Sequence, residues 1–276
     1  MTFELGLSSY IFYWGIQYRK LSATQLVEMT VGLGLHVLQI CDNLPLIKLL
    51  PEQIESLGEL ARSKNLALEV GTRGFDPNEL YSYIEIAARL GSPILRFVPW
   101  SGLETLSKLT IGGLSDFLKP MLESCENHQV TIALENHSEI SDVDLVRFVE
   151  DMHSPYLGIC LDTANSTGLL QKPLETVELL APYTVSLHLK DFQVTKRAGK
   201  GYVISGAPLG KGWLDVPAVF RTLAKYNKQP NVLLELWVDP CDAEQSTLQK
   251  ENDWIEQSIG YAQKIVNADH TFINRI

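Results

Sequence analysis

The sequence predicts a closed parallel (β/α)8 barrel, or TIM barrel, formed by residues 1–276 as a single domain. Strand-like apolar runs alternate with segments of helical periodicity along the whole chain, and there are eight of each, as such a barrel requires. The longest connections between these elements follow strands. A length of 276 residues with 45% hydrophobic content is enough to bury a core of this size.

The expected strands are short apolar runs separated by polar or turn-forming residues. In chain order they are Phe3–Ser9, His36–Cys41, Leu66–Gly71, Pro93–Val98, Val130–Glu135, Leu157–Asp162, Val185–Leu189 and Val232–Trp237.

The expected helices lie between these runs and repeat apolar residues at helical spacing. They are Ser22–Leu33, Pro51–Lys64, Asn78–Leu90, Leu114–Asn127, Asp142–Met152, Pro173–Leu180, Val216–Tyr226 and Asn252–Val266. Residues that favour helix ends fit these limits: Ser22 and Ser141 suit N-caps, Pro51 and Pro173 suit a first turn, and Gly34 and Gly91 suit helix ends.

A doubly wound open sheet is the competing architecture. It would need a glycine-rich phosphate-binding loop after the first strand, and GLSSYIFYWG does not supply one. In a barrel the long connections Tyr10–Leu21, Pro99–Lys108 and Asp191–Leu214 all lie on the face where active sites form. The last contains five glycines. We expect this connection to be either a mobile lid or a solvent-exposed loop that contacts only a neighbouring subunit. The second alternative would make the protein a homo-oligomer.

Composition argues against several classes of partner. The net charge is −10, from 23 basic and 33 acidic residues, which disfavours nucleic acid and anionic membranes. MTFELGLSSY does not resemble a signal peptide, and no stretch of 18 apolar residues predicts a membrane span. The four cysteines show no CxxC spacing, as expected of free thiols in a reducing cytoplasm.

Four successive strand-like runs end in residue types that bind metals, namely Glu135, Asp162, His188 and Glu235. An ionisable group at the end of a buried strand is costly to desolvate unless something neutralises it. On neighbouring parallel strands these side chains would converge, and three carboxylates with one imidazole suit one divalent cation. The alternative for a single carboxylate is a cap on the next helix, and Asp162, which leads into a turn, could do both.

Three cations on the predicted barrel indicate an anionic partner. Arg73 ends the third strand, Arg96 lies within the fourth, and Lys190 follows His188 with inward parity. For Arg96 the alternative is a buried ion pair with Glu69 or another barrel carboxylate. We expect Arg73 and Lys190 nearer the barrel mouth, where they could hold a substrate carboxylate or phosphate. An acidic sugar derivative therefore becomes a credible substrate.

Further substrate contacts are expected beside these groups. His137 lies two residues beyond Glu135 with the same parity, so it points either to the substrate or to a carboxylate that it orients. Trp14, on the first connection, and Trp237, after the last strand, could stack on sugar C–H faces, although simple lid packing would also explain them.

The motifs ALENH, LDTAN, HLKD, PLGKGWLD and ELW, in this order, resemble the xylose isomerase-like TIM-barrel superfamily. The most similar group is that of the sugar phosphate isomerases/epimerases, and the resemblance covers nearly the whole chain. It implies that Glu135, Asp162, His188 and Glu235 hold one divalent ion, Mn²⁺, Mg²⁺, Co²⁺ or Zn²⁺. It also implies that Glu135 and Glu235 act as an acid/base pair on opposite faces of the substrate.

The resemblance is specific for the superfamily and poorly specific for the reaction. The leading expectation is an isomerase or epimerase of a small sugar, keto-sugar or sugar acid that works through a metal-stabilised enediolate. The alternative is a metal-dependent lyase, either a decarboxylase of a 3-oxo sugar acid or a dehydratase. Both need the same metal and carboxylates, so the sequence does not separate them. A non-catalytic sugar-binding barrel is a third hypothesis.

Overall fold

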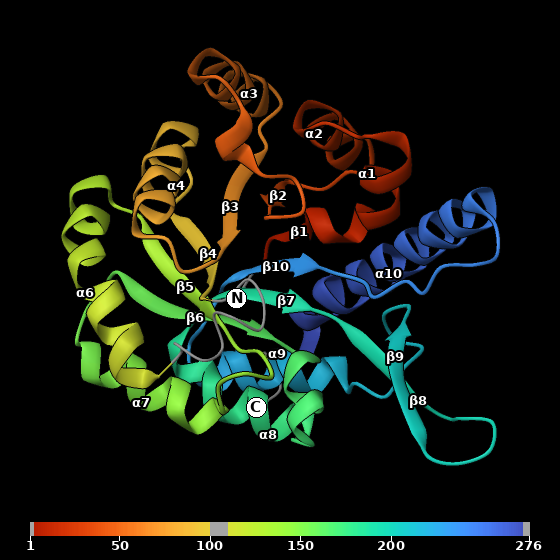
Figure 1. Cartoon of the computed structure of the whole chain (residues 1–276). Coiled ribbons are helices and arrows are strands. Elements are labelled where there is room, and N and C mark those ends of the chain that lie inside the picture. Colours follow the sequence, from red (N-terminus) through yellow and green to blue (C-terminus); the bar gives the residue numbers. More distant parts are fainter. Residues whose placement is uncertain (1–2, 100–109, 273–276) are drawn as a thin grey trace.

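The computed structural model describes residues 3–99 and 110–272, with side chains up to residue 266. Eight parallel strands close into a barrel in the order β1-β10-β7-β6-β5-β4-β3-β2 (Figure 1). The strands are β1 (Leu5–Ser8), β2 (Val37–Ile40), β3 (Ala67–Arg73), β4 (Ile94–Val98), β5 (Thr131–Glu135), β6 (Leu157–Asp162), β7 (Thr184–Leu189) and β10 (Asn231–Leu234). The predicted (β/α)8 barrel is confirmed.

Helices surround the strands on the outside of the barrel (Figure 1). They are α2 (Ala23–Gly32), α3 (Pro51–Ser63), α4 (Pro77–Leu90), α6 (Ile111–His128), α7 (Asp142–Met152), α8 (Pro173–Leu180), α9 (Val216–Lys225) and α10 (Glu244–Phe272). The predicted helix limits agree closely except for α10, which begins eight residues before the expected Asn252. Within the described chain, no helix is long and apolar enough to cross a membrane.

Local sequence explains where the helices begin and end. Ser22 and Gln25 form a capping box at the start of α2, and Oγ of Ser141 accepts the backbone N–H of Asp144 at 3.2 Å at the start of α7. Gly91 ends α4 in the left-handed region with φ +72°, a conformation that costs glycine little. These caps therefore determine the residues at which the helices begin and end.

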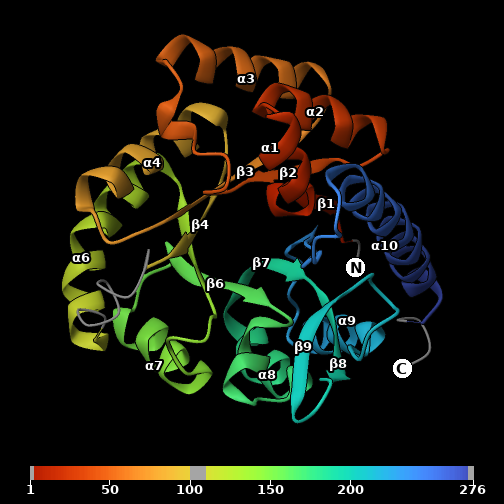
Figure 2. The same ribbon diagram turned by 45° about the vertical axis from the view of Figure 1, so that its right-hand side comes forward.

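The connection after β7 contains an antiparallel hairpin that the sequence did not predict. Strands β8 (Asp191–Lys196) and β9 (Tyr202–Ala207) pair with each other and extend to one side of the barrel (Figures 1 and 2). The carboxylate of Asp191 accepts backbone N–H groups from Gly210, Gly212 and Leu214 at 2.9 to 3.1 Å. The HLKD and PLGKGWLD motifs are therefore joined by a hydrogen-bonded loop. Most of the expected connection Pro99–Lys108 lies outside the described residues.

The barrel interior carries a polar layer below the ends of the strands. Gln39 on β2, Glu69 on β3, Arg96 on β4 and Ser186 on β7 are all at most 2% exposed. Aliphatic residues fill the space between the strands and the surrounding helices. Buried polar groups need partners inside the protein, so this layer constrains the side chains above it.

Candidate metal centre and substrate pocket

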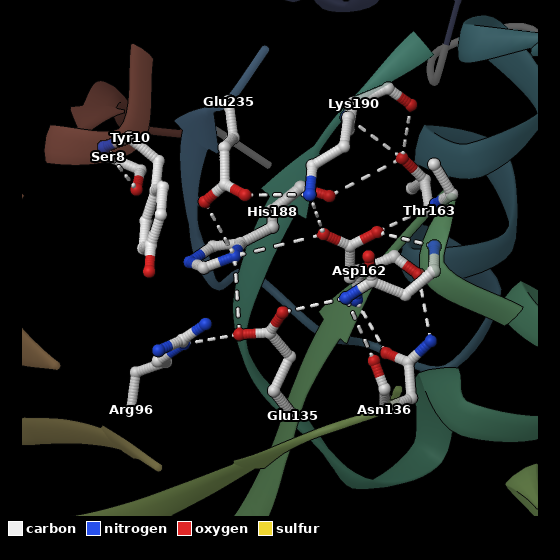
Figure 3. Close-up of polar contacts among 12 residues, drawn as sticks. Ser8, Tyr10, Arg96, Glu135, Asn136, Asp162, Thr163, His188, Lys190 and Glu235 are labelled. Atoms are coloured by element: carbon white, nitrogen blue, oxygen red, sulfur yellow. Dashed lines mark hydrogen bonds and ion pairs between the residues drawn. The ribbon is translucent and has the colours of Figure 1, made fainter. Parts of the chain in front are cut away.

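The four predicted ligands come together at the carboxyl ends of adjacent strands (Figure 3). Glu135 ends β5, Asp162 ends β6, His188 is the penultimate residue of β7, and Glu235 directly follows β10. Nδ1 of His188 lies 3.2 Å from Oε2 of Glu235, 3.6 Å from Oε2 of Glu135 and 3.9 Å from Oδ2 of Asp162. All four side chains are buried.

Three facing atoms of this group make no hydrogen bond with any described residue. They are Nδ1 of His188, Oδ2 of Asp162 and Oε2 of Glu235. Oδ2 of Asp162 has an ion-pair partner in Lys190 at 3.0 Å, whereas Nδ1 of His188 and Oε2 of Glu235 face each other at 3.2 Å without a hydrogen bond. The three residues offer ligand atoms that all lie within 4.8 Å of one another. The donor set is hard oxygen with one imidazole nitrogen, which fits a divalent cation.

Asp162 both caps a turn and faces the site, as its sequence context allows. Its Oδ1 accepts the backbone N–H groups of Ala164 and Asn165 at 2.8 Å each, while its Oδ2 faces His188. Oδ1 of Asn136 accepts the backbone N–H of Asp162 at 2.6 Å, and Nδ2 of Asn136 donates to the backbone carbonyl of Asp162 at 3.0 Å. The turn after β6 thereby fixes the direction of the Asp162 carboxylate.

Lys190 lies buried among the predicted ligands, so its expected place nearer the mouth is wrong, but it lines the cavity and its contact with the substrate stays a prediction. Its Nζ is 2.6 Å from Oε1 of Glu235 and 3.0 Å from Oδ2 of Asp162, and the side chain is buried. Burial lowers the pKa of this ammonium group, but the nearby carboxylates outweigh that effect and raise the pKa. Burial likewise raises the pKa of Glu235, yet Lys190 holds it well below the usual range.

Arg96 makes the buried ion pair that was the alternative for it, with barrel carboxylates other than Glu69. Its Nε binds Oε2 of Glu135, and its Nη1 lies 2.7 Å from Oδ1 of Asp42. Burial raises the pKa of Glu135, but the nearby cations, Arg96 first, more than reverse this, so the pKa lies below its usual range. Nδ2 of Asn165 donates to the second oxygen of Glu135 at 2.8 Å. The sequence did not identify Asn165 as a partner of this carboxylate.

Asp42 is a site residue that sequence reasoning missed. Its carboxylate lies 2.7 Å from Nε of Arg73 and accepts the hydroxyl of Tyr10 at 2.7 Å, in addition to its contact with Arg96. Asp42 comes directly after the second strand-like run, so the strand-end rule that found the four ligands could have found it. Arg73 is 37% exposed, which agrees with its expected place nearer the mouth.

A cavity of about 410 Å³ lies above these charged groups. Its wall includes both predicted tryptophans: Nε1 of Trp14 donates to the carbonyl of Val238 at 2.7 Å, and the ring of Trp237 lies 4.5 Å from Nζ of Lys190. His137 also lines the cavity and contacts the carboxylate of Glu139. The predicted substrate contacts thus share one pocket with Glu135 and Glu235, two of the four predicted ligands.

Glu251 is a second residue of the pocket wall that the sequence did not indicate. It projects from α10 and accepts the backbone N–H groups of Trp14 and Gly15, at 2.6 and 2.9 Å, at the start of α1 (Tyr13–Arg19). Nothing near Glu251 in the sequence signals this contact, because its partners are more than 230 residues away. The contact fixes the aromatic segment at the mouth.

Sequence comparison places the chain among proteins of known fold. Residues 27–265 match the family model of the xylose isomerase-like TIM barrel. The chain is 31% identical over 261 residues to 3-oxo-isoapionate decarboxylase of Pectobacterium atrosepticum, and this match covers 93% of the chain and 94% of that enzyme.

Comparison of structures gives the same fold. D-psicose 3-epimerase of Clostridium cellulolyticum H10 superposes with a TM-score of 0.74 at 14% identity, over 95% of this chain and 99% of that one. A xylose isomerase-like TIM-barrel protein of Mycobacterium smegmatis, solved in complex with magnesium, superposes with a TM-score of 0.64 at 14% identity, over 86% and 88% of the two chains.

Proposed function

The chain belongs to the xylose isomerase-like TIM-barrel family of sugar-modifying enzymes, and we propose that it is a divalent-metal-dependent decarboxylase of a 3-oxo sugar acid. The 31% identity to 3-oxo-isoapionate decarboxylase over almost the whole of both chains supports this reaction class. The proposed reaction is therefore that of the lyase, which was the alternative expectation, and not that of the isomerase or epimerase, which was the leading one.

The cations of the site are the observation that carries the proposal. Two groups of ion pairs, Arg73–Asp42–Arg96–Glu135 and Asp162–Lys190–Glu235, contain three cations that all line the cavity. Lys190 and Arg96 are buried among their carboxylate partners, whereas the side chain of Arg73 is 37% exposed beside Asp42. Arg73 is therefore the charge that is available to a substrate carboxylate.

The metal would be held by Glu135, Asp162, His188 and Glu235. When bound, it supplies a Lewis acid for the carbonyl and neighbouring hydroxyl oxygens of a sugar. The residues around the metal site control the charge of its ligands. Lys190 and Arg96 keep Glu235 and Glu135 ionised through direct ion pairs, so both carboxylates are available as ligands.

The reaction proposed is the loss of CO₂ from a β-oxo acid. Arg73, partly exposed at the pocket wall, holds the substrate carboxylate. The bond from that carboxylate to the adjacent carbon breaks, and its electron pair moves to the 3-oxo oxygen, giving an enolate and CO₂. The carbon then takes a proton from the ammonium group of Lys190, which pairs with Glu235. Lys190 recovers its proton from water.

An epimerase is the second candidate, and one geometric observation favours it. Glu135 and Glu235 lie on either side of His188 (Figure 3), as two carboxylates that serve opposite faces of a substrate would. Epimerisation needs one of the two to be protonated while the other is ionised. Because each carboxylate has its own cationic partner, the site favours two ionised groups, which decarboxylation tolerates and epimerisation does not.

One experiment separates the two reactions. The purified protein is stripped with EDTA, reloaded with Mn²⁺ or Mg²⁺, and incubated with 3-oxo sugar acids and with neutral ketoses. We expect CO₂ release from the acids, no activity before reloading, and little conversion of the ketoses. Mass-neutral conversion of a ketose detected by NMR, without CO₂ release from any acid, would instead identify an epimerase. Full activity in metal-free protein would exclude the proposed centre.

A further inference from the structure

A line of buried hydrogen bonds connects the barrel interior to the imidazole of the candidate metal centre. Nε2 of His188 lies 2.6 Å from Oε1 of Gln39, and Nε2 of Gln39 donates to Oε2 of Glu69 at 2.9 Å. The three residues come from β7, β2 and β3, and each is at most 1% exposed. Water therefore does not compete for these groups, and their orientations depend on one another.

Glu69 decides which end of the Gln39 amide faces His188. The Glu69 carboxylate accepts three hydrogen bonds, from Gln39, from Oγ of Ser186 at 3.0 Å and from Nδ2 of Asn231 at 2.7 Å. With Glu69 ionised, a reversed amide would place its oxygen 2.9 Å from a carboxylate oxygen, with no proton between two buried acceptors. Sγ of Cys41 also donates to Oε1 of Gln39 at 3.1 Å, so the NH₂ group faces Glu69 and the amide oxygen faces His188.

The amide oxygen in turn decides which ring nitrogen of His188 carries the proton. An oxygen acceptor 2.6 Å from Nε2 requires an N–H there. A neutral imidazole has one N–H, so Nδ1 is left with its lone pair, directed at the carboxylates of Glu235, Glu135 and Asp162. Those carboxylates alone would favour the opposite tautomer, because Nδ1–H could donate to one of them.

We propose that Gln39, oriented by Glu69, is a positioning residue that holds His188 in the Nε2–H tautomer and so presents Nδ1 as a metal ligand. The inference rests on the metal site proposed above, but it concerns the state of His188 in the ion-free protein. The barrel core thereby prepares the imidazole for a cation before any ion arrives.

The test is the tautomer of His188 in ion-free protein labelled with ¹⁵N-histidine. Two-bond ¹H–¹⁵N correlation spectra, recorded at a pH where the ring is neutral, should show the proton on Nε2 in the wild type, with His188→Gln identifying the signal. Gln39→Leu removes the acceptor and should shift the ring toward Nδ1–H. Calorimetric titration with Mg²⁺ should then show an affinity about 10- to 100-fold lower.

Two further variants keep the test specific. Gln39→Glu returns an oxygen toward His188 and should restore the Nε2–H tautomer, since the new carboxyl can share a proton with Glu69. Ser186→Ala is the matched control: it removes another hydrogen bond to Glu69 at the same depth but leaves the contact between Gln39 and His188. Its tautomer and its Mg²⁺ affinity should equal those of the wild type.

Several results would overturn the inference. They are an Nδ1–H tautomer in the wild type, an unchanged tautomer in Gln39→Leu, or a loss in Ser186→Ala as large as that in Gln39→Leu. Failure of the proposed function gives a different pattern. A wild type with the Nε2–H tautomer that binds no divalent ion would refute the metal centre and leave the role of Gln39 in place.

Discussion

Replacement of Arg73 by alanine should separate an acidic substrate from a neutral one. Arg73 is the cation of the pocket that is partly exposed, with 37% of its side chain accessible, and its one ion-pair partner among the described residues is Asp42. A hydrogen bond between this guanidinium and a substrate carboxylate is charge-assisted, and such bonds contribute about 1.5–3 kcal/mol. We expect kcat/KM for a 3-oxo sugar acid to fall about 10- to 150-fold.

The assay compares the acid with a neutral keto-sugar of similar size, in wild type and variant. Arg147→Ala is the matched control, because Arg147 on α7 is 71% exposed, lies 3.8 Å from Asp144 and is not part of the pocket wall. Thermal unfolding should barely change in Arg147→Ala, since exposed ion pairs stabilise a fold by at most about 1 kcal/mol. Arg73→Ala removes a partly buried pair and should lower Tm slightly, because Asp42 keeps its contact with Arg96. Equal losses on the acid and the neutral sugar would show that Arg73 is structural, and the acidic-substrate reasoning would be wrong.

Three other substitutions test a metal ligand, the pocket wall and a close backbone contact. Glu235→Gln keeps an oxygen for the metal but removes the carboxylate that pairs with Lys190, the proposed proton donor. Metal content should persist while turnover falls by about 10²-fold or more; loss of both together would make Glu235 only a ligand. Burial raises the pKa of Glu251 from 4.5 to about 7, although two backbone N–H groups lower it. The folded state then holds a proton that the unfolded state has lost between these pH values. As the pH rises from 4.5 to 7, the free energy of unfolding of the wild type should therefore fall relative to that of Glu251→Gln, by at most about 1.4 kcal/mol per pH unit. Urea unfolding measures this difference, and a difference that does not change with pH would contradict the prediction. A Cβ at Gly206 would lie 1.9 Å from the carbonyl oxygen of Trp237, so Gly206→Ala should lower Tm clearly more than Gly112→Ala, which meets nothing within 4 Å.

Much of the candidate site follows from the sequence because ligands at strand ends obey a simple rule. Parallel strands in one barrel end on one face, so Glu135, Asp162, His188 and Glu235 had to converge once their runs were identified as strands. The same rule applies to Asp42, which was missed because a single aspartate after a strand resembles a helix cap. The rule gives positions along a strand but not the pairing of charges, which is why Lys190 was expected at the mouth.

The hairpin β8–β9 shows the opposite case. In β8 only Phe192 and Val194 alternate with polar residues, and β9 begins with the exposed apolar run Tyr202–Val203–Ile204, so only a short periodic pattern marks these strands. What orders its base is the carboxylate of Asp191, whose partners lie 19 to 23 residues further along the chain. Contacts over such distances leave no periodic signal in the sequence.

The sequence by itself determined the barrel, the order of its elements and the identity of the four convergent side chains, because strand periodicity and helix caps are local properties. Only the tertiary structure decided which side chains form ion pairs and hydrogen bonds with one another. Lys190 pairs with Glu235 and Asp162, Arg96 with Glu135, and Gln39 with His188, across strands that are 28 to 149 residues apart. Those partners are set by ångström-scale distances inside a closed barrel, where burial makes each ion pair and hydrogen bond mutually dependent.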